Sequence, residues 1–153
     1  MPYRTLRITD VGPLSVEGLT WHPLRHALDV RGFGLNAYSA AAAGDELIED
    51  HVEGDESGGH QELYVVLQGR ARFEIDGEEV LVDAGSLVFL PDPTTRRHAV
   101  GDAPGTLVLA VGGDPAAPYA VSGWEARFRA RGLYEGGEPG EAVAILRAAS
   151  AER

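Results

Sequence analysis

Short segments in which apolar and polar residues alternate, separated by glycine-containing turns, fill the middle of this chain. In the segment 70–76, Ala71, Phe73 and Ile75 alternate with charged residues, which is the period of a strand with one buried face. The pair Asp76-Gly77 is typical of a two-residue turn between antiparallel strands. The same criteria predict strands at 33–39, 47–52, 62–68, 70–76, 79–83, 87–90, 96–100 and 106–111. Short strands at this spacing, with no helix between them, predict an all-β, antiparallel sandwich or barrel.

The pattern differs at the two ends of the chain. Residues 1–32 look irregular, with a short helical turn at 24–28, and the glycines in 54–59 predict a loop. Beyond residue 113 the composition becomes helical at 124–131 and 141–149. We therefore expect a single domain over 1–153, with a barrel core at about 33–112 and a C-terminal helical tail at about 122–150.

Charge and composition exclude several classes of function. The 153 residues include 24 acids and 13 bases, every base is arginine, and the formal net charge is −11. Such a charge disfavours nucleic acid and anionic membrane surfaces as partners. The chain has no cysteine and no lysine, which excludes thiol nucleophiles, cysteine-ligated metals and lysine imines. There is no secretory signal pattern and no apolar run that could span a bilayer, so we expect a cytoplasmic protein.

Two spaced motifs indicate a particular family. Glu62 is followed by six residues and Gly69, and Gly85 is followed by five residues and Pro91. These spacings resemble the second half of the first cupin motif and the opening of the second. The segments HQELYVVLQGRARFEIDGEEV and SGWE also resemble small bacterial cupin-domain proteins of undefined activity. The resemblance implies a jelly-roll barrel, also called a double-stranded β-helix, with its core between Gly44 and Gly112.

The same resemblance implies a metal site inside the barrel. In metal-binding cupins the first motif supplies two histidines and the glutamate, and the second motif supplies a third histidine. On this chain it implies that His51, Glu62 and His98 hold one divalent transition metal, with His60 or Glu49 as a fourth ligand. Nitrogen and oxygen ligands of this kind suit Fe, Mn, Zn or Ni, and no organic cofactor is expected.

The second motif also supports a site without metal. Arg96 occupies the position where the family has its ligand histidine, and it shares a strand face with His98 because residues two apart point the same way. Glu62 could therefore pair with Arg96 across the barrel. In that version a ligand would contact His60, Tyr64 and Arg96.

Three functions stay open on the sequence alone. The first is a metal-dependent enzyme acting on a small polar metabolite. The second is a non-catalytic binder or sensor in which Arg96 and Arg97 hold a carboxylate or phosphate. The third is a metal-free isomerase that uses His60 or His98 as its base. All three are compatible with a homodimer, because pairing between two copies covers exposed sheet edges.

Overall fold

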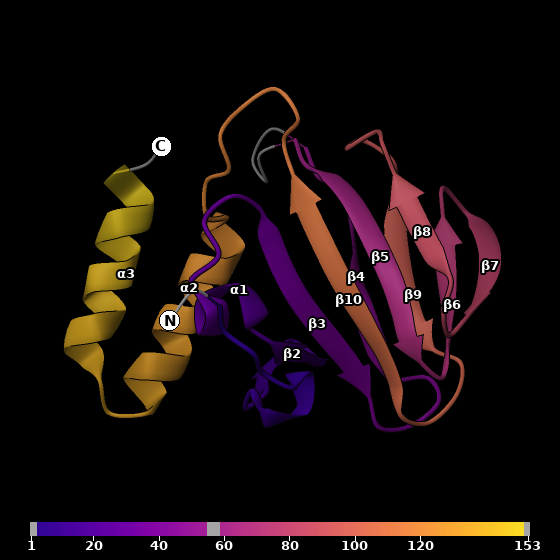
Figure 1. Cartoon of the computed structure of the whole chain (residues 1–153), viewed down its shortest axis with the longest axis horizontal. Coiled ribbons are helices and arrows are strands. Elements are labelled where there is room, and N and C mark those ends of the chain that lie inside the picture. Colours follow the sequence, from indigo (N-terminus) through magenta and orange to yellow (C-terminus); the bar gives the residue numbers. More distant parts are fainter. Residues whose placement is uncertain (1–2, 55–58, 152–153) are drawn as a thin grey trace.

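Two antiparallel sheets face each other, and two helices lie beside one end of them (Figure 1). The computed structural model describes residues 3–54 and 59–151. The strands are β1 (Leu14–Val16), β2 (Leu19–His22), β3 (Gly34–Ala40), β4 (Glu46–His51), β5 (Gln61–Gln68), β6 (Arg70–Ile75), β7 (Glu78–Asp83), β8 (Leu87–Leu90), β9 (Arg97–Gly101) and β10 (Thr106–Gly113). The helical elements are η1 (Ile8–Asp10), α1 (Leu24–Leu28), α2 (Gly123–Glu135) and α3 (Pro139–Ala151).

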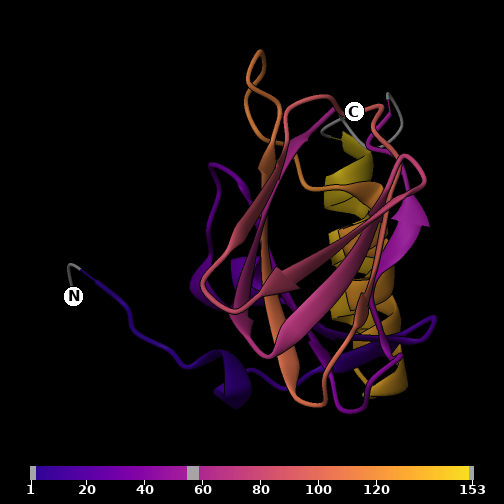
Figure 2. The same cartoon turned by 90° about the vertical axis from the view of Figure 1, so that its right-hand side faces the viewer.

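The strands form one sheet of six and one of four. The six-stranded sheet has the order β1-β2-β3-β10-β5-β8, and the four-stranded sheet has the order β4-β9-β6-β7. Figure 2 shows the two sheets facing each other. The eight strands expected from alternation correspond to β3 through β10, so the predicted all-β antiparallel fold is confirmed. The turn at Asp76-Gly77 has the two positive φ angles, 48° and 84°, that its sequence predicted.

The N-terminal region is more regular than the sequence suggested. Residues 14–22 form the hairpin β1–β2, which extends the six-stranded sheet beyond β3. Its turn, Glu17-Gly18, places both residues at positive φ, 49° and 100°. Strands of three and four residues show little alternation, and neither is a continuous apolar run like the one at 87–90, which explains why this hairpin was missed. The helical turn predicted at 24–28 is α1.

The core lies between the two sheets. Tyr64, Val66 and Phe73 are almost completely buried there, and they come from the inward faces of β5 and β6. A smaller cluster of Val16, Trp21 and Phe128 joins the N-terminal hairpin to α2. The predicted loop at 54–59 includes residues 55–58, which lie outside the described residues. No helix among the described residues is long and apolar enough to cross a membrane.

Candidate functional site

A cavity of about 1000 Å³ opens between the sheets at the end where α2 begins. Its walls come from β3, β4, β5 and β10 and from the segment 117–125 that leads into α2. Five carboxylates line it, and no arginine among the described residues does. One of the five, Glu125, is neutralised by Arg25, whose guanidinium lies 2.7 Å from it. The cavity is therefore an acidic environment.

A bulge in β4 aims His51 into this cavity. The register between β4 and β9 slips between Ile48 and His51, so two residues of β4, Glu49 and Asp50, lie opposite the single residue of β9 between Ala99 and Arg97. Such a bulge redirects the side chains that follow it. As a result Ile48, Glu49 and His51 all line the cavity, whereas Asp50 is exposed.

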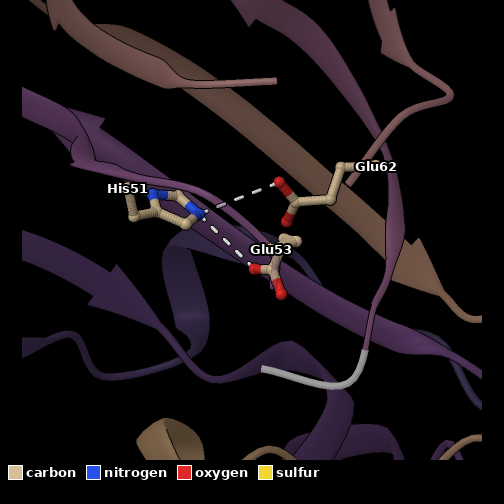
Figure 3. A group of neighbouring side chains, drawn as sticks. All are labelled: His51, Glu53 and Glu62. Atoms are coloured by element: carbon tan, nitrogen blue, oxygen red, sulfur yellow. Dashed lines mark ion pairs between the residues drawn. The ribbon is translucent and has the colours of Figure 1, made fainter. Parts of the chain in front are cut away.

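The His51 ring has a fixed orientation. Its Nδ1 atom lies 2.7 Å from the carbonyl oxygen of Glu49, and Nδ1 must be the donor because a carbonyl can only accept. The Nε2 atom then faces the cavity, 3.4 Å from Glu53 Oε1 and 4.0 Å from Glu62 Oε2 (Figure 3). Burial opposes the charged ring, but contact with Glu53, the Glu49 carbonyl and the charge of Glu62 outweigh it and raise the pKa of His51.

Two other side chains fix the position of the Glu62 carboxylate. It lies on the inward face of β5, where Tyr64 donates a hydrogen bond to Oε2. Arg97 Nε lies 3.2 Å from the same oxygen. Burial, together with the charge of Glu53, raises the pKa of Glu62, although Tyr64, Arg97 and His51 act in the opposite direction. Glu62 is therefore a buried carboxylate with a fixed position at the cavity wall.

Arg97 supplies the buried positive charge of the site. Its side chain has no exposed surface, and its Nη1 atom donates to the carbonyl of Pro93 at 3.3 Å. Its Nε and Nη2 atoms have no hydrogen-bond partner among the described residues. Arg97 lies behind Glu62 and does not line the cavity. It therefore acts on the site through the Glu62 carboxylate.

The donor set of the cavity fits a divalent transition metal. One imidazole nitrogen and two carboxylates, from His51, Glu53 and Glu62, place ligand atoms within 4.8 Å of one another. Ligands bonded tetrahedrally to such a metal at ~2.1 Å lie roughly 3.4 Å apart. The separation of 3.4 Å between His51 and Glu53 matches this value. The separation of 4.0 Å between His51 and Glu62 would have to shorten by about half an ångström.

Two of the ligand-contact residues predicted from the sequence line the cavity. They are His60 and Tyr64, which share the inward face of β5 and its approach with Glu62. The His60 ring also lies 5.5 Å from the ring of Tyr119, on the opposite wall. His60, Glu62 and Tyr64 therefore all face the cavity.

The structure does not bring Arg96 and His98 to this site. Arg96 is exposed and pairs with Asp50, and His98 Nε2 lies 3.3 Å from Glu46 Oε1 on the outer surface. The reason is a turn ahead of β9, in which Thr94 and Thr95 donate backbone hydrogen bonds to Asp92. This turn makes Arg97 the first inward residue of the strand. The partner of Glu62 is thus Arg97, one residue later than expected.

Sequence reasoning missed Glu53 as a candidate ligand. The sequence did contain a signal for Glu53. Glu49, His51 and Glu53 are spaced two residues apart, and all three line the cavity. Burial also raises the pKa of Glu49. The segment containing Trp124 was noted for its family resemblance and its helical composition but not as part of a site, and it forms one wall of the cavity.

Comparison with known proteins identifies the fold. No protein-family model matches the sequence, and no curated protein matches it. Among solved structures, a cupin protein from Bacteroides fragilis is 18% identical over 80% of this chain and 92% of its own, with a TM-score of 0.56. A Cupin 2 conserved barrel domain protein from Salinispora arenicola is 24% identical over 76% and 91%, with a TM-score of 0.57. A variant of the Streptomyces protein PAC13, solved with uridine, is 17% identical over 72% and 82%, with a TM-score of 0.53.

These likenesses define the fold of the protein. The overall arrangement of the chain agrees with the solved cupin structures from Bacteroides fragilis and Salinispora arenicola over most of its length. The chain has the cupin fold, an antiparallel jelly-roll barrel with a polar cavity at one end.

Proposed function

We propose that the protein binds a small polar molecule in the cavity and holds a divalent metal ion there with His51, Glu53 and Glu62. The observation that carries the proposal is the orientation of His51. The hydrogen bond from its Nδ1 atom to the Glu49 carbonyl directs the Nε2 lone pair of the neutral ring at both carboxylates. Histidine ligands of metals are commonly oriented by such a bond at their other nitrogen. Fe, Mn, Zn and Ni all accept this ligand set.

Residues of the chain would position the metal ligands and contact the bound molecule. A bound metal would supply a Lewis acid that polarises an oxygen atom of the ligand. Tyr64 and Arg97 keep Glu62 in place, because both contact its Oε2 atom. His60 lies at the cavity wall, where its ring can contact the bound molecule. Tyr38 lines the same wall as a neutral phenol, because burial and the charge of Glu62 raise its pKa far above the ordinary value.

The charge of the cavity favours a neutral or positively charged ligand. Within the described chain, the lining includes Glu49, Glu53, Glu62 and Asp114, and the two nearest guanidinium groups lie behind carboxylates. A carboxylate or phosphate would meet this acidic lining without an arginine to hold it. The sequence hypothesis that Arg96 holds an anion therefore has no support in the geometry, since Arg96 is at the outer surface.

The test is the metal content of purified protein without an affinity tag. Wild-type protein, refolded separately with Fe, Mn, Zn and Ni, is dialysed and measured by elemental analysis. We expect about one metal per chain in the wild type and trace amounts in His51→Ala. His60→Ala is the matched control, because it removes a cavity histidine that lies outside the ligand group, and it should keep the metal. Trace metal in the wild type under all four conditions would refute the metal part of the proposal.

A metal-free cavity is the second candidate, and one observation favours it. The Arg97 guanidinium already balances the charge of Glu62 at 3.2 Å. His51 with a raised pKa can balance Glu53 in the same way. The cavity would then act as a binder or isomerase whose polar groups are arginine, glutamate and histidine. Binding of uncharged polyols to EDTA-treated protein, measured by thermal shift, would support it, and binding that requires added metal would exclude it.

A further inference from the structure

Glu49 is a carboxylate of the cavity whose side chain has no partner among the described residues. The four other carboxylates of the lining are each paired: Glu125 with Arg25, Glu62 with Arg97, Glu53 with His51, and Asp114 with the backbone N–H of Ala116. Within residues 3–54 and 59–151, the Glu49 side chain forms no ion pair and no hydrogen bond. The bond from His51 goes to the Glu49 backbone carbonyl instead.

The position of Glu49 makes a missing partner unfavourable. The bulge in β4 turns this residue toward the cavity, where its side chain is partly buried. A partly buried carboxylate loses water contacts, and a nearby positive charge offsets that loss. Glu49 also lies outside the metal-binding group, whose ligand atoms come from His51, Glu53 and Glu62. A metal held by that group would therefore leave Glu49 unpaired.

The nearby guanidinium groups of the described chain are engaged elsewhere. Arg25 and Arg97 already pair with other carboxylates. Arg127 in α2 does not line the cavity, and its Nη2 atom lies 4.0 Å from Glu17 Oε1 between two exposed side chains. The positive charge that would pair with Glu49 is therefore expected to come from a bound molecule.

Aromatic rings form much of the remaining wall. Besides Tyr64, the lining includes Tyr38, His60, Tyr119 and Trp124. Tyr38 lies close to Glu49, since burial and the charges of Glu62 and Glu49 together raise the pKa of Tyr38. The Tyr38 hydroxyl forms no hydrogen bond with the described residues, so it is available to a ligand. Ring faces attract positive charge and pack against alkyl groups, so this environment favours an organic cation.

We propose that the cavity takes a small organic cation of the alkylammonium class, whose charged nitrogen lies against Glu49. The cavity volume of about 1000 Å³ suits a small organic molecule. This inference rests on the proposed function, because it names the class of the small polar molecule. It does not depend on the metal, because Glu49 is outside the metal-binding group. The net charge of −11 also favours the approach of cations.

Titration calorimetry with two cations tests this proposal. Choline and ethanolamine are each compared with an uncharged counterpart in which a carbon atom replaces the nitrogen, so that the shape is kept and the charge is lost. At least one of the cations should bind wild-type protein roughly tenfold more tightly than its counterpart. EDTA-treated protein is used, so that the result does not depend on metal content. Binding of neither cation, or equal affinity for a cation and its counterpart, would overturn the proposal.

Variants of β4 locate the charge that the cation meets. Glu49→Gln should remove the preference for the cation, and Glu49→Asp, which keeps the charge, should retain it. Asp50→Asn is the matched control, because it removes the same charge from the adjacent residue, which is exposed and pairs with Arg96. This control should bind the cation as the wild type does. Equal losses in Glu49→Gln and Asp50→Asn would mean that net charge alone attracts the cation, contrary to the proposal.

Two further measurements keep this result separate from the metal site and from folding. Near-ultraviolet circular dichroism establishes that Glu49→Gln keeps the fold. The metal content of Glu49→Gln should equal that of the wild type, and its loss would place Glu49 among the metal ligands and overturn the assignment. A wild type that holds no metal but prefers the cation would refute the metal site alone and support this proposal.

Discussion

Arg97 Nε lies 3.2 Å from Glu62 Oε2, and the Arg97 side chain has no exposed surface. The two residues come from β9 and β5, which belong to different sheets. Their ion pair therefore crosses the interior of the barrel and connects the sheets beside the cavity. Because both charges are buried, each depends on the other for its stability.

Replacing Arg97 should destabilise the protein strongly. In Arg97→Met the buried Glu62 carboxylate loses its cation, and we expect the free energy of unfolding to fall by about 3–5 kcal/mol. The double variant Arg97→Met, Glu62→Gln should recover a large part of this loss, because no unpaired charge then remains. Urea denaturation of the four proteins in the cycle measures both effects. Equal stability of the single and double variants would mean that the pair is not coupled.

The pH dependence of stability should report on His51. Its pKa is raised in the folded protein, mainly because the contacts to Glu53 and Glu49 outweigh the opposing effect of burial. A raised histidine pKa adds stability that is complete below the ordinary value of about 6.5 and is lost as the pH rises through the folded value. Metal-free protein should therefore lose stability over that interval, as measured by urea denaturation at several pH values.

His51→Gln is the control for this measurement, because glutamine has no charge to lose. The variant should lack the decline, whereas His60→Gln should keep it. Metal affinity should change in the opposite direction, since protons compete with the metal for Nε2. Titration calorimetry with Mn²⁺ should thus show tighter binding at higher pH. An affinity independent of pH would argue against His51 as a ligand.

Two glycines at positive φ should respond differently to alanine. Gly69 has φ of 72°, and a Cβ atom there would lie 2.6 Å from Thr106 Oγ1 and 2.9 Å from Thr106 Cα. Gly77 has φ of 84° but open space around it. Gly77→Ala should cost about 1–2 kcal/mol for the backbone alone. Gly69→Ala should cost roughly 2 kcal/mol more because of the clash. Thermal unfolding of the two variants provides the comparison, and equal costs would contradict it.

The buried ion pair beside the cavity should contribute more than an exposed one. Arg25 in α1 contacts both oxygens of Glu125 in α2, and the side chains are 10% and 2% exposed. Arg25→Met should lower the free energy of unfolding by about 3–5 kcal/mol. Arg31→Met removes an exposed pair with Asp29 and should cause no measurable change. Hydrogen exchange in α2 should also accelerate in Arg25→Met and not in Arg31→Met.

The alternation of apolar and polar residues, together with the turn residues, was sufficient to predict most strands of the barrel. Strands such as 70–75 alternate strictly and are joined by Asp76-Gly77, so each has its own signal in a few neighbouring residues. The Glu62 position followed from the same alternation, since Tyr64 and Val66 on its face are buried. The hairpin at 14–22 lacks such a signal, because its strands of three and four residues contain at most two periods of alternation.

The site was harder to predict because it depends on two local irregularities. The bulge in β4 places Glu49 and His51 on the cavity side, and the turn before β9 places Arg97 inside. Both change which residues face inward, and neither has a marker in the composition of its strand. A shift of one residue moves every side chain of a strand to the opposite face of the sheet. For this reason His98 and Arg96 were assigned to the wrong face.

The turn at 92–95 has a consequence for how such barrels diverge. The number of residues in that turn determines which residue faces inward at the start of β9. Removing one residue there, with the strand pairing kept, would rotate β9 by one place and turn His98 toward His51, Glu53 and Glu62. A second imidazole at this cavity would therefore require only a deletion in a surface turn, with Val100 replacing Ala99 on the inward face of β9. Comparisons that align only substituted positions would not detect it.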